Sequence, residues 1–472
     1  MTEFWHFESN PAVRDASPAL IDTSLDVTIC YKDLRHACQS ISSLISPTAP
    51  RKKTLGFILC RNQWPAVAGY LAALRSGHAV CLLPDNLSEA QLTPLLQAYQ
   101  PTWIIAPASN IAAVSALDVT PFLHQSWSLA KTPFFDDTDE INQDLALLLS
   151  TSGSTGSSKM VRLSFTNLAV NAQQIANYLG LTAQERPVTS LSMPYSYGLS
   201  VVNSHLAAGA ALVMTDSGIT SPDFWNIMKS KRVTSIAGVP FLYQTLQRLK
   251  LEDMDLPDLK TLTQAGGRMP QPLLVHFVTM AQRKGWRFFA MYGQTEAAPR
   301  IAYVPPERMP EKAGSIGIAI PGGKLSIDIE SNELIYEGAN VMMGYAQSRA
   351  DLARPNELNG VLRTGDLARQ DNDGFFWITG RLTRLAKVVG YRLNLDELEK
   401  EIERAGISPV ALWENDGTLH FATSHQQLND RLPEFARSWR LPLHLLISHV
   451  VDTLPNNING KVDYILLRDI YS

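Results

Sequence analysis

The feature that most constrains this sequence is a polar, glycine-containing segment after an apolar run. Residues 145–149 are Leu-Ala-Leu-Leu-Leu, which predicts a buried strand, and residues 150–158 contain Ser, Thr and Gly alone before Lys159. Glycine lets the backbone turn its N–H groups inward without a Cβ clash. Such donors, together with hydroxyls and one cation, are what a polyphosphate requires. The segment therefore predicts a phosphate-binding loop at a strand end.

A flexible Ser/Gly linker is the alternative interpretation of this segment. A linker rarely follows a buried strand so abruptly, and residues 160–165 again look like a strand. The spacing also differs from the common P-loop, where the second glycine directly precedes the lysine. Here Gly156 lies three residues before Lys159, which indicates a different class of phosphate loop.

Composition, charge and cysteine pattern exclude several other classes of protein. The chain has 472 residues, 45% of them hydrophobic, enough for roughly two to four packing units. Its formal net charge of −4 argues against a nucleic-acid binder. The four cysteines follow no zinc spacing, so buried free thiols are expected. We find neither a signal-peptide pattern nor an apolar run of about 18 residues, and we expect a cytoplasmic protein without a membrane span.

Strand-like and helix-like segments alternate before residue 314, which favours an α/β fold with largely parallel sheets. Short β segments with turn glycines at 314–344 predict a small antiparallel or barrel-like unit. A boundary is expected near residues 381–384, although a continuous extension of the same core is the alternative. Strands are expected at 54–60, 78–83, 103–106, 187–193, 211–214 and 235–239, and helices at 64–75, 199–208 and 396–405.

A second motif follows the predicted strand at residues 287–290. Residues 291–296 are Met-Tyr-Gly-Gln-Thr-Glu. Glu296 could hold Mg²⁺, which takes oxygen ligands and substrate phosphates. Tyr292 could stack on a base and Thr295 could donate to a phosphate. An ordinary helix start with Thr295 as its cap explains the segment equally well.

Two further segments could contact a nucleotide. Gly266 and Gly267 allow close approach of a flat ligand, although an ordinary turn before a helix near residue 272 is the alternative. Asp366, in a Thr-Gly-Asp sequence at a strand end, could accept hydrogen bonds from both ribose hydroxyls. An Asp in such a turn is more often a simple turn former. Residues 371–374 predict a hairpin turn.

These motifs together resemble those of the AMP-forming, adenylate-forming enzymes: acyl- and aryl-CoA synthetases, peptide-synthetase adenylation domains and luciferases. The resemblance covers essentially the whole chain. Residues 151–156 with Lys159 are similar to the family's phosphate loop, and 292–296 to its Tyr-Gly-x-Thr-Glu motif. The chain departs from the family at Ser158 and Met160, where many members have Pro and Gly, and at the hinge residue, Thr383, commonly Asp or Lys.

The resemblance implies an α/β fold with a mobile lid. Residues 1–382 would form a large N-terminal domain of two α/β subdomains plus a small β-barrel-like unit. Residues 383–472 would form a small α+β C-terminal lid domain. Gly390 would then belong to a lid loop beside the thiol channel.

The resemblance also assigns roles that the residues alone leave open. It makes Glu296 the Mg²⁺ ligand, and it makes Lys461, Thr295 and Arg392 catalytic. Taken alone, Arg392 and Lys461 would be solvated surface charges. The resemblance implies nucleotide binding by Thr151, Ser152, Gly153, Ser154, Thr155, Gly156, Lys159, Gly266, Gly267, Tyr292, Gly293, Gln294, Asp366 and Arg381.

The implied reaction has two steps. A carboxylate attacks the α-phosphorus of MgATP to give an acyl-adenylate and pyrophosphate, and a thiol of coenzyme A or of a carrier protein's phosphopantetheine then displaces AMP. Charge neutralisation and positioning would supply the catalysis.

Residues 194–200 are similar to the family's aromatic segment at the wall of the acid pocket, which points to Tyr195, Ser196, Tyr197 and Gly198. Enzymes that activate α-amino acids usually have an Asp at the place of Ser196. Because a buried ammonium without a carboxylate is costly, an apolar acyl or aryl acid is favoured. A plain core role for Tyr195 and Tyr197 fits the sequence equally well.

Three other functions are weighed against the thiol ligase. An amide ligase of the coronafacate-ligase-like branch would pass the adenylate to an amine, and an amino-acid adenylation enzyme would take a different acid. A non-catalytic nucleotide-binding regulator would be expected to lack Lys461, Glu296 or Asp366, and all three are present.

Overall fold

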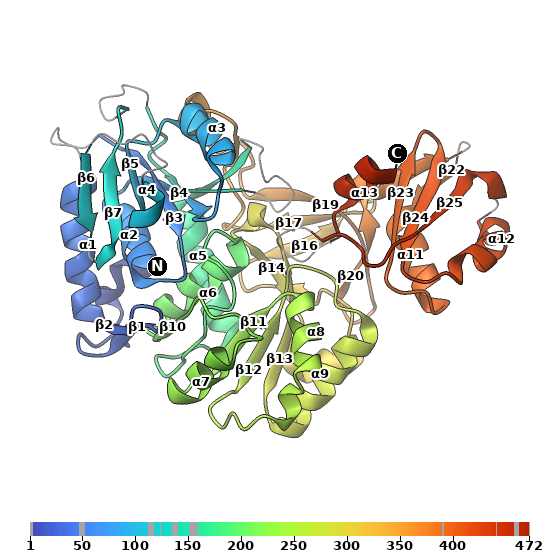
Figure 1. The fold of residues 1–472 in the computed structure, drawn as a ribbon, viewed down its shortest axis with the longest axis horizontal. Helices are drawn as coiled ribbons and strands as arrows, with labels where there is room; N and C mark the ends of the chain where they lie inside the picture. The colour runs from blue at the N-terminus through green and yellow to red at the C-terminus, as the bar shows by residue number, and fades with distance from the viewer. Residues whose placement is uncertain are drawn as a thin grey trace. The chain divides into compact units, whose positions relative to one another are not determined.

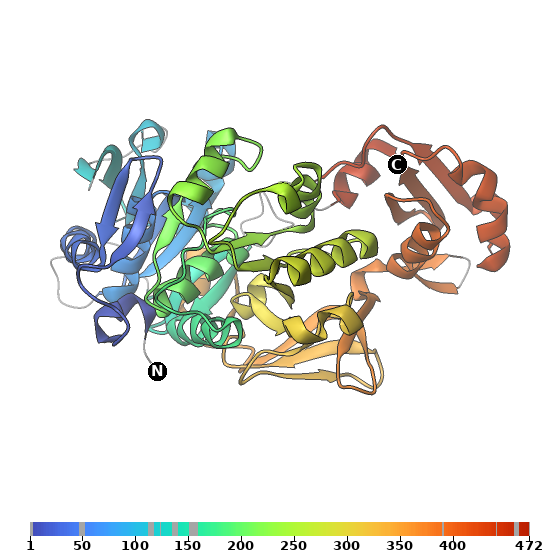
Figure 2. The same cartoon turned by 90° about the horizontal axis from the view of Figure 1, so that it is seen from below.

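The computed structural model describes residues 3–46, 52–111, 118–122, 124–134, 140–150, 159–388, 391–439, 441–456 and 462–471. The chain forms two compact units, Met1–Lys324 with Tyr336–Leu362, and Leu325–Ile335 with Arg363–Ser472. Figure 1 and Figure 2 show helices and strands mixed along the chain, and the predicted α/β fold is confirmed. The predicted boundary after residue 382 stays a prediction.

The largest sheet of the first unit has eight strands in the order β18-β9-β8-β4-β3-β5-β7-β6. Its middle strands run parallel and are almost wholly buried, because both faces of the sheet are covered. These are β3 (Leu55–Cys60), β4 (Ala79–Pro84), β5 (Trp103–Pro107) and β8 (Leu145–Ser150). The antiparallel strands beside them are β9 (Met160–Ser164), β18 (Gly344–Ala346), β7 (His124–Lys131) and β6 (Asp118–Phe122).

Side chains along each strand alternate between the two faces of this sheet, and helices cover both faces. Ile58 and Leu82 point toward α1 (Tyr31–Ile45) and α2 (Trp64–Arg75), whereas Phe57 and Cys81 point toward α3 (Glu89–Tyr99). The free thiols of Cys38, Cys60 and Cys81 are buried and that of Cys30 is partly exposed. A short sheet, in the order β10-β1-β2, joins β10 (Leu212–Met214), β1 (Pro18–Asp22) and β2 (Val27–Cys30).

A second sheet of the first unit has the order β11-β12-β13-β14-β15. One of its faces packs on α8 (Pro240–Arg248) and α9 (Gln271–Lys284), through ring contacts among Tyr243, Phe277 and Phe288. The other face packs on α5 (Phe165–Leu179) and α6 (Ser196–Ala207), whose other sides enter the core of the large sheet. The strands are β11 (Ser235–Gly238), β12 (Thr261–Gln264), β13 (Arg287–Gly293), β14 (Arg300–Tyr303) and β15 (Ile318–Ala319).

The register of the three parallel strands in this sheet aligns their carboxyl ends. Gly238 lies opposite Gln264, and Gln264 lies opposite Ala290. The segments that follow β11, β12 and β13 therefore leave the sheet at one edge. The glycine pair at 266–267 follows β12, and the motif at 292–296 begins in the last two residues of β13, so two of the predicted site segments are neighbours.

The strand predicted at residues 187–193 is wrong. In this fully described stretch the structure has isolated bridges, Pro187 to Ser235 and Val188 to Val213, in place of a ladder. Proline has no N–H to donate to a neighbouring strand. The N–H of Ser190 bonds back to the carbonyl of Val188, which turns the chain away from the sheet.

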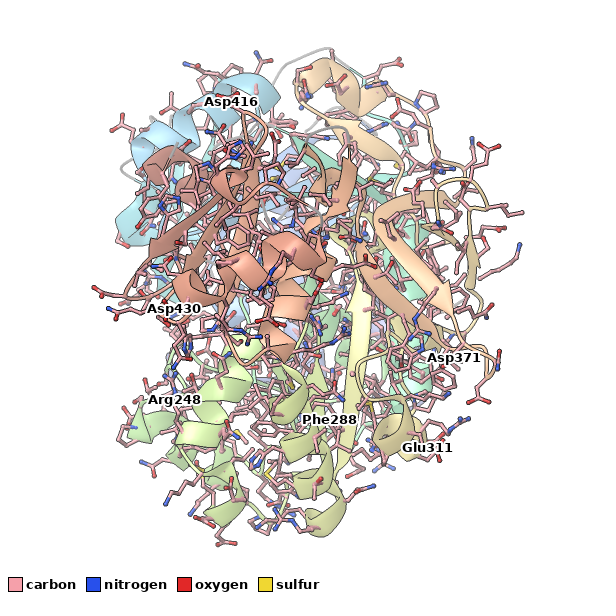
Figure 3. All side chains as sticks on the ribbon, turned by 90° about the vertical axis from the view of Figure 1, so that its right-hand side faces the viewer. Arg248, Phe288, Glu311, Asp371, Asp416 and Asp430 are labelled. Atoms are coloured by element: carbon pink, nitrogen blue, oxygen red, sulfur yellow. The ribbon has the colours of Figure 1, made fainter. Side chains whose placement is uncertain are left out.

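The second unit holds most of a four-stranded sheet in the order β16-β17-β19-β20. Its strands are β16 (Lys324–Ile327), β17 (Glu333–Glu337), β19 (Val361–Gln370) and β20 (Phe376–Arg381). The hairpin turn predicted at 371–374 joins β19 to β20, with the N–H of Gly374 bonded to the carbonyl of Asp371. Figure 3 shows Asp371 at this turn and Phe288 in β13 of the first unit.

The rest of the second unit is α+β, as predicted. The hairpin of β21 (Leu385–Val388) and β22 (Tyr391–Asn394) leads into α11 (Leu395–Arg404). A sheet in the order β23-β24-β25 follows, with its core around Ile402 and Phe421. Its elements are β23 (Val410–Asn415), β24 (Thr418–Thr423), α12 (Leu428–Ser438), β25 (Leu446–Val450) and α13 (Tyr464–Tyr471).

A partly buried ion network follows the predicted hinge residue, Thr383. Arg384 Nε donates to Asp396 at 2.8 Å, and its guanidinium carbon lies 4.0 Å from the ring centroid of Tyr464. Tyr464 Oη in turn donates to Glu399 at 3.0 Å. The network ties α11 to the start of α13. None of the helices in the described stretches has the length and apolarity that crossing a bilayer requires.

Stability of the first unit should fall in mild acid because His78 is buried as a neutral ring. Burial, with the nearby Lys53 ammonium, lowers the pKa of His78 to about 4, below the ordinary 6.5. Between these values the unfolded chain binds one more proton, so the free energy of unfolding falls as pH drops, by at most about 1.4 kcal/mol per pH unit. His78→Gln should lessen this slope, measured by hydrogen exchange in β3 and β4.

The matched control is His36→Gln, which replaces an exposed histidine of α1. This variant should keep the wild-type dependence on pH. Equal slopes for His78→Gln and the wild type would contradict the assignment.

Candidate active site

The turn after β13 is shaped by the close approach of β14. A Cβ on Gly293 would lie 1.8 Å from the carbonyl oxygen of Pro299, so no larger residue fits there. Gln294 Nε2 donates to Tyr292 Oη at 3.2 Å, which steadies the Tyr292 ring at the strand end. Residues 292–296 are all partly exposed, so this turn is accessible to a ligand.

The glycine pair after β12 also permits a close contact. Gly266 has a φ of +83°, and a Cβ there would lie 2.3 Å from Tyr195 Oη. Gln264 Nε2 donates to the carbonyl of Gly267 at 2.8 Å, which closes this turn. The pair therefore lies beside Tyr195 of the aromatic segment, and it belongs to the same sheet edge as Tyr292.

The side chain of Thr295 contacts the start of α6. Its Oγ1 lies 3.1 Å from Ser196 Oγ. Thr295 is the first residue of a short 3-10 helix, Thr295–Ala297, whose N-cap is Gln294 and has no side-chain cap bond. The helix-cap alternative for Thr295 therefore does not describe the structure. Two hydroxyls from distant segments instead face each other at the motif.

Glu296 is a partly buried carboxylate, and among the described residues its side chain accepts a hydrogen bond from one neutral donor. Tyr345 Oη donates to Glu296 Oε1 at 2.9 Å, and Lys159 Nζ lies 3.8 Å from the centroid of the Tyr345 ring. Burial raises the pKa of Tyr345, and the adjacent carboxylate adds to this shift. Within the described ranges no Lys, Arg or His lies within ion-pair distance of Glu296. The carboxylate is therefore available to a cation.

This arrangement fits Mg²⁺. Mg²⁺ is usually bound by one or two carboxylates together with substrate phosphates, and it rarely occupies an all-protein cage. In the part of the chain that the structure describes, no cluster of three or more His, Cys, Asp or Glu side chains could hold a metal alone. Glu296 would be the protein ligand, and Tyr345 would orient it.

Tyr345 was not found from the sequence, and neither was the residue that holds it. Arg162 is fully buried in β9; its Nε donates to the carbonyl of Tyr345 at 3.2 Å and its Nη2 lies 3.1 Å from Glu357. These bonds fix β18, and hence Tyr345, against β9. Tyr345 is 49 residues from Glu296, and no local pattern marks such a pair.

The aromatic segment of the predicted acid pocket forms the first turn of α6. Ser196, Tyr197 and Gly198 are buried and Tyr195 is partly exposed. Tyr197 Oη donates toward the carbonyl of Thr263 at 2.9 Å, which ties α6 to β12. A Cβ on Gly198 would lie 2.2 Å from the carbonyl oxygen of Ser192. Tyr197 is thus part of the core and also part of the wall between α6 and the sheet.

In the second unit the structure brings Asp366 and Arg381 together. They lie opposite each other in the β19–β20 ladder, and Arg381 Nε donates to Asp366 Oδ1 at 2.7 Å. Asp366 is 3% exposed, whereas the Arg381 side chain is 57% exposed. The N–H of Gly365 bonds to Glu333 Oε1, which holds the turn before Asp366. The ion pair orients the Asp366 carboxylate.

The remaining predicted residues cannot be placed in this way. The backbone of Arg392 lies in β22 opposite Lys387, and its side chain is outside the description. The predicted phosphate loop and the predicted catalytic lysine lie outside the described residues; these are Thr151, Ser152, Gly153, Ser154, Thr155, Gly156 and Lys461.

Comparison with known proteins gives several likenesses. The 2-succinylbenzoate–CoA ligase of Bacillus subtilis (strain 168) is 26% identical over 471 residues, 94% of this chain and 93% of that protein. A feruloyl-CoA synthase of an Amycolatopsis species is 29% identical over 272 residues, 55% of this chain and 54% of that protein. The structure of B. subtilis O-succinylbenzoate coenzyme A synthetase with ATP and magnesium has a TM-score of 0.75 at 23% identity, covering 99% of this chain and 100% of that one.

The family model described as AMP-binding enzyme matches residues 7–346, well over half of the chain. That range includes the predicted phosphate loop, the glycine pair and the motif at 292–296. The adenylate-forming family predicted from the sequence is therefore confirmed: this chain belongs to the AMP-binding enzyme family.

Proposed function

We propose that the protein is an ATP-dependent, AMP-forming ligase that activates a carboxylic acid and transfers the acyl group to the thiol of coenzyme A. The observation that carries this proposal is the convergence of Tyr292, Thr295 and Glu296 with Ser196 at one sheet edge. A base-stacking ring, two hydroxyls and an available carboxylate there suit a nucleotide, its phosphates and its magnesium ion. Membership of the AMP-binding enzyme family supports the same activity.

In the first step a carboxylate oxygen of the acid forms a bond to the α-phosphorus of ATP, and the bond from that phosphorus to pyrophosphate breaks. Thr295 and Ser196 donate hydrogen bonds to the oxygens that meet there. Glu296 would hold Mg²⁺, which supplies positive charge to the phosphates. Lys461 and Arg392 supply further positive charge as the bond order changes.

In the second step a thiol attacks the acyl carbon, and the bond from that carbon to the phosphate oxygen of AMP breaks. The product is a thioester. Coenzyme A is the proposed acceptor because two relatives, 2-succinylbenzoate–CoA ligase and feruloyl-CoA synthase, are named for it. The phosphopantetheine arm of a carrier protein offers the same thiol and is the alternative acceptor.

The acid is proposed to have a mainly apolar body. Tyr195 precedes α6, Tyr197 lies in its first turn, and the facing strand contributes Ala237. Ser196 stands where an enzyme for α-amino acids would need a carboxylate, and a buried ammonium without one is costly. An acyl or aryl acid therefore suits this wall better than an amino acid.

The domain organisation and location are part of the same proposal. Residues 1–382 would act as the adenylation core and residues 383–472 as a mobile lid that pivots at Thr383. Each of the two compact units supplies some of the predicted nucleotide-binding residues. We place the protein in the cytoplasm, where ATP and coenzyme A are present and where buried thiols such as Cys38 and Cys81 stay reduced.

The proposed function predicts exchange of pyrophosphate into ATP that depends on an added acid. A panel of fatty, aryl, dicarboxylic and amino acids should identify acids that the wild type activates, and coenzyme A should then yield a thioester. Lys461→Ala should lower the exchange rate by at least about a hundredfold, because one transition-state charge contact is typically worth that much. The same variant should still form thioester from a supplied acyl-adenylate.

Exchange with no acid on the panel would contradict the ligase function. Unchanged exchange in Lys461→Ala would remove Lys461 from the adenylation step without touching the rest of the proposal.

Glu296→Gln should raise the Mg²⁺ concentration that half-saturates exchange by at least about tenfold, because it removes the charged metal ligand. Tyr345→Phe should raise it less, because it removes a hydrogen bond to that ligand. Glu311→Gln makes the same charge change on an exposed residue and serves as the control. Identical magnesium titrations for Glu296→Gln and Glu311→Gln would exclude Glu296 as the ligand.

A further inference from the structure

A narrow cavity lies between α5, α6 and the face of the sheet formed by β11, β12 and β13. Its volume is about 20 Å³, room for one or two waters or one small polar group. Apolar residues such as Ile175, Leu179 and Met291 form much of its wall. A cation, Arg300, lies in the same wall. A charged group in such surroundings requires an explanation.

Arg300 is 2% exposed, and its neighbours are neutral. Its guanidinium carbon lies 4.7 Å from the centroid of the Tyr197 ring, and its Nη2 donates to Ser200 Oγ at 3.1 Å. Its Nε is buried with no hydrogen-bond partner. Within the described ranges no carboxylate lies within ion-pair distance of Arg300. The guanidinium thus keeps donor capacity and a full charge in a poorly solvated place.

A buried cation without a counter-ion is unfavourable unless something else supplies the negative charge. The backbone of Arg300 is firmly held, since its carbonyl accepts hydrogen bonds from Asn171 and Asn340. Arg300 does not need its charge to keep β14 in place. An anionic group of a ligand would neutralise the guanidinium charge, most favourably through a bidentate hydrogen bond.

The other titratable groups at the cavity are Glu185, His205 and Tyr197. Glu185 lies near His205, at the C-terminal end of α6, and its Oε2 accepts a hydrogen bond from Thr234 Oγ1 at 2.6 Å. His205 Nδ1 bonds to the carbonyl of Val201, and its Nε2 is buried without a partner. Burial lowers the pKa of His205 to about 4 and raises that of Tyr197. At neutral pH the near end of the cavity therefore carries the positive charge of Arg300.

The position of Arg300 relates the cavity to the reacting end of the acid. Ser196 contacts Thr295, and Ser200, which contacts Arg300, is four residues further along α6. Four helical residues span about 6 Å along the axis. An acid with its reacting carboxylate at Thr295 would therefore bring a group at about that separation to the guanidinium.

We infer that Arg300 selects acids that carry a second carboxylate, separated from the reacting one by about 6 Å along an apolar body. The inference rests on the proposed ligase function and deepens it. The substrate class is a dicarboxylic acid, aliphatic or aryl, in place of a plain fatty or aryl acid. Arg300 is a binding residue for the group that does not react.

The test uses ATP–pyrophosphate exchange by the full-length enzyme with matched acids. Each diacid of about four to eight carbons, and each carboxyl-bearing aryl acid, is compared with its own monomethyl ester. The wild type should favour the best diacid over its ester by about a hundredfold in kcat/KM, because the ester leaves the guanidinium unpaired. Arg300→Met should bring that ratio close to one, and Arg300→Lys should restore part of it.

Arg248→Met is the matched control, because it removes the same charge from an exposed site on α8. This variant should keep the wild-type ratio. Figure 3 shows Arg248 on that helix. If Arg300→Met does not fold, the comparison of diacids with their monomethyl esters in the wild type still tests the inference, because it measures the preference for a second carboxylate directly.

Equal use of diacids and their esters by the wild type would overturn the inference and leave the ligase function standing. That result would indicate that Arg300 keeps its charge in this cavity without an anionic group of the substrate. An absence of exchange with every acid would overturn the ligase function itself.

Discussion

The hydrogen-bond register among β11, β12 and β13 is the constraint on which the candidate site depends. Because Gly238, Gln264 and Ala290 lie side by side, three segments leave the sheet at one edge. The alternation of side chains then sends one set of residues toward α8 and α9 and the other toward α5 and α6. A shift of one residue in one strand would exchange these faces and separate the turn at Tyr292 from the start of α6.

Charge is distributed unevenly over the buried parts of the first unit. Arg162 has Glu357 as a partner and serves to hold β18. Glu296 and Arg300 are different, because each lacks an ionic partner in the described part of the chain. The Glu296 carboxylate could bind a cation and the Arg300 guanidinium could bind an anion, and the two residues are four apart in sequence. The first suits the magnesium ion of a nucleotide, and the second suits one end of the acid.

Much of the fold could be predicted from local patterns, and much of the site could not. Apolar runs located β3 and α2 to within a residue, and the motifs at 151–159 and 292–296 led to the family. The strand expected at 187–193 failed because Pro187 cannot donate and Ser190 turns the chain. Tyr345 and Arg300 were missed because their roles arise from contacts between distant segments. Arg300 follows the motif closely, yet a sequence does not show that its charge is buried.

The most direct test of the account is a crystal structure with a stable acyl-adenylate analogue, an acyl sulfamate of adenosine built on a diacid. The account predicts that the adenine stacks on Tyr292, that the sulfamate lies beside Thr295, and that the free carboxylate reaches Arg300. An analogue bound elsewhere on the chain, or one whose acyl group points away from α6, would contradict it.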